Sequence, residues 1–103
     1  MDTKIKMARV LDDLNHAIAL DPQNAFLFYN RGNLYVQRKE YERAIEDYTA
    51  AISINRSLAE AYYNRGLAYI NSDNKRKGLQ DLSKAGELGL FKAYSVMKKY
   101  SEK

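Results

Sequence analysis

A segment of eight residues that recurs after 34 residues constrains the fold of this chain more than any other feature. Residues 28–35 read Phe-Tyr-Asn-Arg-Gly-Asn-Leu-Tyr, and residues 62–69 read Tyr-Tyr-Asn-Arg-Gly-Leu-Ala-Tyr. A fixed period of this length indicates a stacked array in which every repeat is one supersecondary unit. The chain has 103 residues, the size of one domain. We therefore expect a single domain of stacked repeats.

Apolar residues recur every three or four positions along most of the chain, which is the spacing of one helix face. Asp21 and Pro22 end the first such segment, because the residue before a proline is pushed out of helical geometry. No stretch has the pattern of a strand, so the predicted fold class is all-α. The pattern predicts helices over residues 5–20, 24–37 and 40–54, a fourth ending near residue 71, a fifth through residues 78–88, and a closing helix from residue 90.

Two helix starts carry residue types that cap helices. Asn24 precedes the second helix and is a good N-cap residue. Ser57 and Glu60 form a Ser-x-x-Glu capping box, whose two side chains satisfy backbone N–H groups of the first turn. We expect this box to start the fourth helix.

Stepping the sequence by 34 residues aligns side chains of similar size. Gly32 and Gly66 share one position, where we expect two helices to approach closely, because a helix contact at about 8–10 Å leaves no room for bulk. The small residues expected opposite these glycines are Ala44, Ala51, Gly78 and Ala85. The tyrosines assigned to the core are Tyr35, Tyr48, Tyr62 and Tyr69.

These positions resemble the tetratricopeptide repeat (TPR) family. The family pattern of aromatic and small residues is met by Phe28, Gly32, Tyr35, Ala44, Tyr48 and Ala51, and again by Tyr62, Gly66, Tyr69, Gly78, Leu82 and Ala85. The chain departs from it because the family proline is present only at Pro22, and the usual Leu before the glycine is Arg31 or Arg65. Residues 81–89 are also similar to the closing segment of some bacterial arrays.

The resemblance implies an α-α superhelix of antiparallel helix pairs, in which a first-type helix is followed by a second-type helix. It divides the single domain of residues 1–103 into four parts. These are the second-type helix of an incomplete repeat over residues 1–24, full repeats over residues 25–58 and 59–92, and a capping helix over residues 93–103.

Opposite charges also recur with the 34-residue period. The series are Arg31, Arg65 and Lys99, and Asp13, Asp47 and Asp81. Pairing within a repeat leaves two of these residues alone, whereas pairing between successive repeats uses all six. We therefore predict the pairs Asp13–Arg31, Asp47–Arg65 and Asp81–Lys99.

By resemblance, the first-type helices line a concave groove that binds peptides. Amide side chains there pair with peptide N–H and C=O groups, and tyrosines add rigid contact area. A groove of about 600 Å² is at the low end for recognition, so we expect a non-catalytic scaffold that binds a protein or peptide segment weakly, or as part of a longer array. The predicted groove residues are Tyr29, Asn30, Asn33, Gln37, Tyr63, Asn64, Leu67, Asn71 and Lys98.

Two other ligand classes have less support. Some family members bind chaperone C-terminal carboxylates through lysines and asparagines; Asn33, Asn64 and Lys98 match that set, but Tyr29 and Tyr94 replace its two lysines. Nucleic-acid binding is the other alternative, because groove aromatics stack on bases and the C-terminal third is basic. The acidic residues Glu60, Asp73 and Asp81 disfavour it, and steep salt dependence would distinguish it.

The first helix is of the second type and has no first-type partner. Part of the side that carries Val10, Leu14 and Ala17 is therefore expected to be exposed, and such patches mark interfaces. We expect the chain either to belong to a longer array or to form a homodimer through this helix. At the other end, Tyr100 occupies the glycine position and Lys98, Lys99 and Lys103 are polar, as expected of a cap. A purely structural array segment that binds no groove ligand is the remaining alternative.

Catalysis has no support in the sequence. Cysteine is absent, the single histidine, His16, has no carboxylate cluster around it, and glycines occur singly. We expect no enzyme activity, metal or cofactor. No apolar run approaches the roughly 20 residues of a membrane span, so we expect a soluble protein, with a cytoplasmic location favoured.

Overall fold

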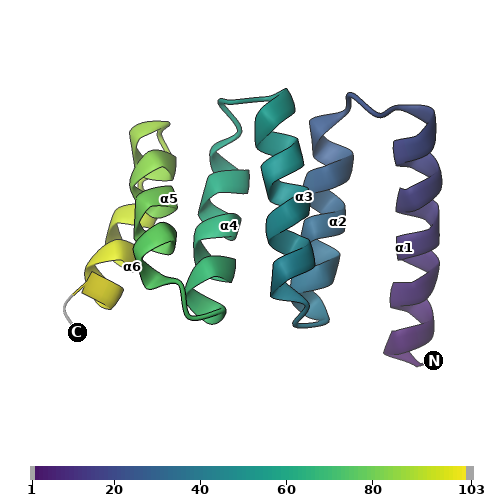
Figure 1. Ribbon diagram of the computed structural model, residues 1–103, viewed down its shortest axis with the longest axis horizontal. Helices are drawn as coiled ribbons and strands as arrows, with labels where there is room; N and C mark the ends of the chain where they lie inside the picture. The colour runs from purple at the N-terminus through teal and green to yellow at the C-terminus, as the bar shows by residue number, and fades with distance from the viewer. Residues whose placement is uncertain (1, 102–103) are drawn as a thin grey trace.

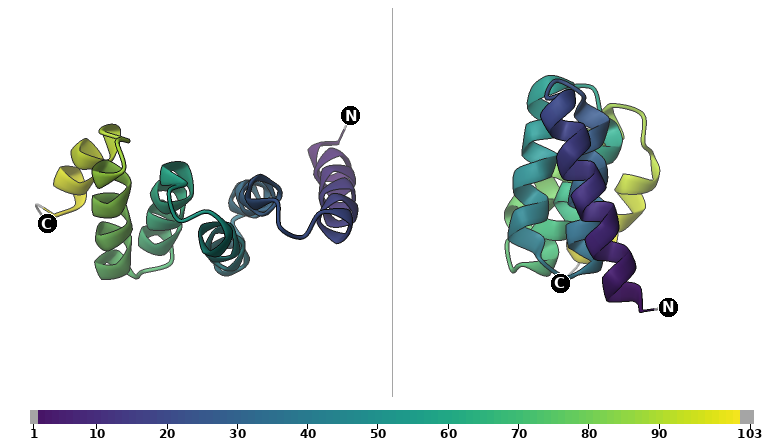
Figure 2. Two further views of the ribbon diagram at one scale, coloured as in Figure 1. Left: turned by 90° about the horizontal axis from the view of Figure 1, so that it is seen from above. Right: turned by 90° about the vertical axis from the view of Figure 1, so that its right-hand side faces the viewer.

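In the described part of the chain, six antiparallel α-helices follow one another in a row along the longest axis of the molecule (Figure 1). The computed structural model describes residues 2–101, and no strand occurs in that part of the chain. Each helix packs on its neighbours in the chain, and α2 also meets α4 (Figure 2). The helices are α1 (Thr3–Leu20), α2 (Ala25–Gln37), α3 (Tyr41–Ile54), α4 (Ala59–Asn71), α5 (Lys75–Glu87) and α6 (Lys92–Ser101).

This order confirms the all-α repeat fold. The predicted repeats 25–58 and 59–92 each hold one helix pair, α2 with α3 and α4 with α5. Residue 1 of the first predicted part and residues 102–103 of the last, including the expected polar Lys103, lie outside the described residues. None of the described helices combines the length and the apolar character that a membrane span requires.

The close approach expected at the glycines is present. A Cβ atom on Gly66 would lie 2.9 Å from the carbonyl oxygen of Gly78, and one on Gly78 would lie 2.7 Å from that of Gly66. A Cβ atom on Gly32 would lie 2.7 Å from the ring of Tyr48. The absence of a side chain at these positions lets the two helices of each repeat pack directly.

The core is a line of small residues with a few large ones. Tyr48 and Leu82 are the largest fully buried side chains. The other three tyrosines assigned to the core, Tyr35, Tyr62 and Tyr69, are only half-buried, so that assignment holds fully for Tyr48 alone. The remaining core residues are mostly alanines: Ala25, Leu34, Ala44, Ala51, Leu58, Ala61, Ala68, Ala85 and Ala93.

The two predicted helix caps have different outcomes. Asn24 caps α2 as expected, since its Oδ1 accepts a hydrogen bond of 3.1 Å from the backbone N–H of Phe26. The Ser57–Glu60 capping box is wrong: the N-cap residue of α4 is Leu58, and no side chain caps this helix. Leu58 is buried against Ala51 and Ala61, so this helix start is held by apolar packing.

Candidate functional site

A polar network joins three helices at the centre of the molecule. The buried hydroxyl of Tyr48 on α3 donates to Oδ1 of Asn33 on α2 at 2.5 Å. The side-chain amide of Asn64 on α4 donates to the same oxygen at 2.9 Å and to the hydroxyl oxygen of Tyr29 at 3.1 Å. The network therefore fixes the orientation of both asparagines between α2 and α4.

Burial determines the chemistry of this network. It raises the pKa of Tyr48 well above the ordinary value, and the nearby Tyr29 adds to the shift. The phenol therefore stays neutral and acts as a donor. The amide N–H groups of Asn33 and the carbonyl oxygen of Asn64 are available to a ligand, because they make no hydrogen bond to any described residue.

A hollow of about 250 Å³ lies over this network. Four of the predicted groove residues line it: Asn33, Asn64, Leu67 and Asn71. Its other lining residues are Val36, Tyr48 and Ala68, which are not among the predicted groove residues. Val36 follows Asn33 by three residues on α2, so the two lie on the same helix face. This spacing could have indicated Val36 as a groove residue.

The structure places the other predicted groove residues elsewhere. Asn30 and Gln37 are exposed, and Gln37 lines a separate hollow with Met7 of α1. Tyr63 lies under Lys92, whose Nζ is 4.8 Å from the ring centroid. Lys98 is exposed on α6 and does not line the hollow.

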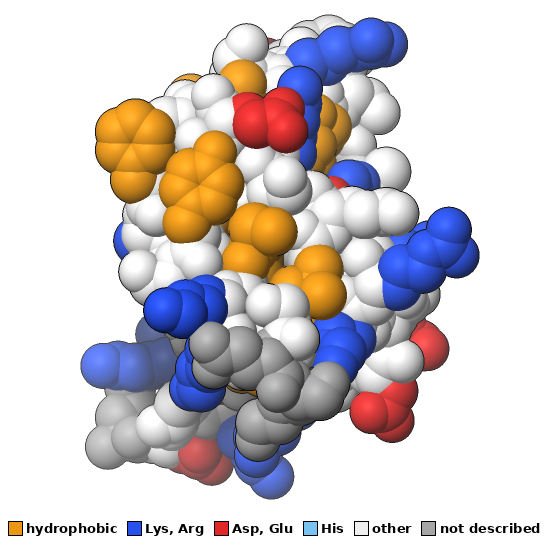
Figure 3. Space-filling view, turned by 90° about the vertical axis from the view of Figure 1, so that its left-hand side faces the viewer, with side chains coloured by type: hydrophobic (Ala, Val, Ile, Leu, Met, Phe, Trp, Pro, Cys, Tyr) orange, Lys and Arg blue, Asp and Glu red, His pale blue; other side chains and the backbone are white. Residues whose placement is uncertain are grey.

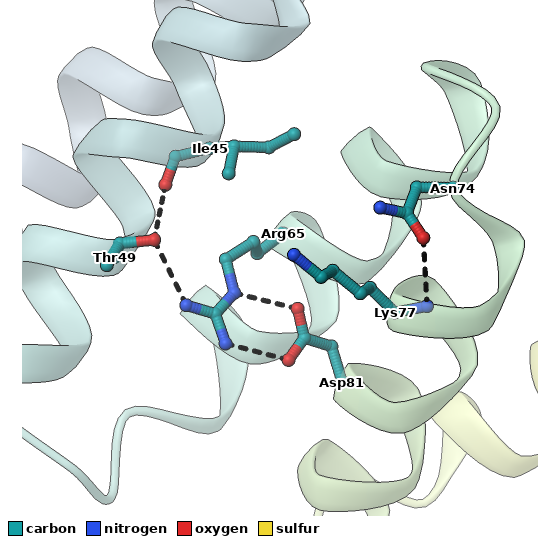
Figure 4. Close-up of polar contacts among 6 residues, drawn as sticks. All are labelled: Ile45, Thr49, Arg65, Asn74, Lys77 and Asp81. Atoms are coloured by element: carbon teal, nitrogen blue, oxygen red, sulfur yellow. Dashed lines mark hydrogen bonds and ion pairs between the residues drawn. The ribbon is translucent and has the colours of Figure 1, made fainter.

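The predicted ion pairs between successive repeats are wrong. Both Asp47 carboxylate oxygens accept hydrogen bonds of 2.8 Å from Arg31, within one repeat. Arg65 makes the same two-pronged contact with Asp81 at 2.7 and 2.8 Å (Figure 4). These hydrogen bonds raise the pKa of both arginines. At the end of the series, the Nζ atom of Lys99 lies 5.6 Å from the centroid of the Tyr100 ring.

Helix rotation explains the error. Each arginine does reach the preceding second-type helix, but it binds Asn15 at 2.9 Å and Thr49 at 3.1 Å. These residues follow Asp13 and Asp47 by two positions, which is a rotation of about 200° around the helix axis. Asp47 and Asp81 therefore face the first-type helix of their own repeat.

The two ends of the row carry exposed apolar side chains. On α1, Val10 is 47% exposed, Leu14 and Ala17 are half-buried, and no residue of the helix is fully buried. At the opposite end, Phe91 and Tyr94 are exposed. Figure 3 looks onto the α5–α6 end and shows hydrophobic side chains gathered there beside Lys and Arg side chains.

Two features bear on whether the described residues could form a catalytic or metal-binding site. His16 is exposed on α1, with Nδ1 2.9 Å from the carbonyl oxygen of Asp12. Among residues 2–101, no group of three or more His, Cys, Asp or Glu residues is arranged to hold a metal ion.

Family models for tetratricopeptide repeats match three overlapping parts of the chain. The one described as TPR repeat matches residues 32–72, and two described as tetratricopeptide repeat match residues 14–46 and 59–88. No curated protein matches the chain.

Three solved structures share the fold over most of their length. The first TPR of Spaghetti (RPAP3) bound to HSP90 peptide SRMEEVD is 28% identical with a TM-score of 0.89, covering 96% of this chain and 80% of that one. The second TPR of Spaghetti with the same peptide is 31% identical with a TM-score of 0.78, covering 81% and 77%. The second TPR domain of human RPAP3 with HSP70 peptide SGPTIEEVD is 28% identical with a TM-score of 0.88, covering 97% and 85%.

Proposed function

Because the chain belongs to the tetratricopeptide repeat family, we propose that it is a non-catalytic interaction module that binds an extended segment of a partner protein in the hollow between α2 and α4. Similar structures with bound HSP90 and HSP70 peptides support a protein-interaction role. The observation that carries the proposal is the hydrogen-bonded pair of Asn33 and Asn64, which line the same hollow and leave the amide N–H groups of Asn33 and the carbonyl oxygen of Asn64 without another hydrogen bond among the described residues.

This pair matches the chemistry of a peptide backbone. A peptide unit presents one C=O acceptor and one N–H donor, so it pairs with the free amide N–H groups of Asn33 and the free carbonyl oxygen of Asn64. Tyr48 and Tyr29 hold the two side chains in place before a ligand arrives, which lowers the entropy cost of binding.

The lining also indicates what kind of segment fits. Among the described residues that line the hollow, none is Lys, Arg, Asp or Glu, and Val36 and Leu67 contribute to its apolar part. The bound segment is therefore one with an apolar side chain between neutral residues, recognised without charge pairing. A hollow of this size favours micromolar or weaker affinity.

The chaperone-peptide mode is a less suitable match for this chain. Tyr29 and Tyr94 stand where the family clamp has lysines. Tyr94 packs over Gly86, where an added Cβ atom would lie 2.5 Å from its ring. A peptide carboxylate would therefore meet the hydroxyl group of Tyr29 rather than an ammonium group.

The test is a binding screen with an array of neutral heptapeptides that each carry one apolar residue. The SRMEEVD peptide and a poly(dT) strand serve as comparison ligands. We expect micromolar or weaker binding of array members, with little change in affinity between about 50 and 200 mM salt. Asn64→Ala should weaken binding about tenfold, since it removes the acceptor for the ligand. Gln80→Ala, on the exposed side of α5, should leave binding unchanged.

Three outcomes would overturn the proposal. The first is tight binding of SRMEEVD that depends on its free carboxylate, which would indicate a clamp. The second is binding of poly(dT) alone with steep salt dependence, which would indicate a nucleic-acid site. The third is the absence of any groove ligand in the array, which would favour a structural role.

A further inference from the structure

One face of α1 is shaped like a repeat interface but has no partner helix among the described residues. In α3, the face turned to the first-type helix of its own repeat consists of Ala44, Asp47, Tyr48 and Ala51, all at most 5% exposed. The equivalent residues of α1 are 34 positions earlier: Val10, Asp13, Leu14 and Ala17. Val10 is 47% exposed and Asp13 is exposed, so this part of the face is open on α1. Figure 2 (right) shows α1 in front, at the end of the row of helices.

The open face has a charge pattern that is complementary to itself. Lys6, Val10, Asp13 and Ala17 are spaced by four, three and four residues, so they lie on one side of the helix. Lys6 lies four residues before Val10, and Asp13 lies three residues after it. An antiparallel copy of the helix centred on Val10 therefore places each Lys6 near an Asp13. Among residues 2–101, neither Lys6 nor Asp13 makes an ion pair.

We propose that α1 pairs with α1 of a second copy in an antiparallel arrangement, around a twofold axis near Val10. Val10 of each copy then contacts Val10 of the other, and Lys6 of each copy pairs with Asp13 of the other. Lys6 of the other copy then lies beside Asp13, as Arg31 lies beside Asp47 within one repeat. A face that pairs with itself closes the assembly at two copies.

A head-to-tail arrangement would place Lys99 of one copy beside Asp13 of the next. Tyr100 opposes it, because this residue stands at the position of Gly32 and Gly66, where even a Cβ atom would lie under 3 Å from the neighbouring helix. Lysine also lacks the planar fork with which arginine binds both carboxylate oxygens. An open arrangement of this kind would grow into filaments instead of stopping at dimers.

The dimer should be weak. The 18 residues of α1 make a helix about 27 Å long, which gives an interface smaller than those of stable complexes. Its two ion pairs are at the surface, where salt screens them. We expect a dissociation constant on the order of 10 μM, increasing with ionic strength.

The experiment is sedimentation equilibrium of the full chain over a concentration series that reaches several hundred micromolar. Lys6→Asp and Asp13→Lys should each weaken dimerisation about tenfold or more, because each places like charges together. The double variant exchanges the charges and should restore the wild-type association. Val10→Asp should abolish dimerisation, because it places two carboxylates at the twofold axis. Circular dichroism checks whether this variant remains folded.

Lys99→Glu is the matched control for the head-to-tail alternative and should leave the mass unchanged. The inference is overturned if the wild type stays a monomer over the whole series, if the double variant fails to recover, or if species larger than a dimer appear and depend on Lys99. Peptide binding in the hollow between α2 and α4 is measured on the same variants, and it does not involve this face of α1. A failure of either proposal therefore leaves the other in place.

Discussion

In each full repeat, one arginine side chain also binds the helix that precedes the repeat. Arg65 binds the carboxylate of Asp81 within its repeat and, through Nη1, the hydroxyl oxygen of Thr49 on the preceding helix (Figure 4). Its guanidinium lies 5.7 Å from the centroid of the Tyr62 ring, so the aromatic face covers it. Arg31 repeats this arrangement with Asp47, Asn15 and Phe28. A half-buried guanidinium therefore connects three helices at each repeat.

The three periodic aspartates provide a matched test of this pair. Asp81→Asn should lower the free energy of unfolding by about 2 kcal/mol, because it leaves the half-buried Arg65 without its counter-charge. Asp13→Asn should change it by less than about 0.5 kcal/mol, since Asp13 is exposed. Urea unfolding at low protein concentration measures both. Equal effects of the two substitutions would mean that the pair adds nothing.

Helix packing in the repeat formed by α4 and α5 depends on contact between backbones. A Cβ atom added to Gly66 of α4 would lie within 3 Å of the carbonyl oxygen of Gly78 on α5. A Cβ atom added to Gly78 would also lie within 3 Å of the carbonyl oxygen of Gly66. Leu82 and Asp81 close the same contact from α5. Because backbone cannot move aside as a side chain can, this contact sets the distance between the two helices.

Gly66→Ala tests the distance between α4 and α5. Alanine favours a helix by about 1 kcal/mol over glycine, yet the clash with the carbonyl oxygen of Gly78 should produce a net loss of about 2 kcal/mol in unfolding free energy. Urea unfolding of Gly66→Ala, Gly78→Ala and the double variant measures the loss. The double variant should lose less than the sum, because both changes act on one contact. A stabilised Gly66→Ala variant would contradict the structure.

The whole molecule behaves as a row in which each helix depends on its neighbours. Fully buried residues are present in every helix from α2 to α6, whereas α1 has none and packs mainly on α2. In such arrays stability is the sum of the repeats and of the contacts between them. The part of the row with the fewest buried contacts should therefore open most often.

Hydrogen exchange measures this gradient. Amides in α1 should exchange about 10- to 100-fold faster than those in α4 and α5, because local opening of α1 exposes little buried surface. The protein is measured at low concentration, where it is a monomer, because dimerisation through α1 would protect the amides of that helix. Uniform protection across the six helices would contradict the expectation and indicate that the chain unfolds as one unit.

The sequence by itself determined the all-α repeat fold, the helix order and the close approach at Gly66. These features follow from local periodicity and from side-chain size, which a single chain displays directly. Of the groove residues expected from the family resemblance, Asn33, Asn64, Leu67 and Asn71 share one hollow. Tertiary structure alone decided that Arg65 binds Asp81 and not Asp47, and that Tyr48 holds Asn33. Those outcomes depend on how far each helix is rotated about its axis, and the two positions that separate Asp47 from Thr49 already correspond to about 200°.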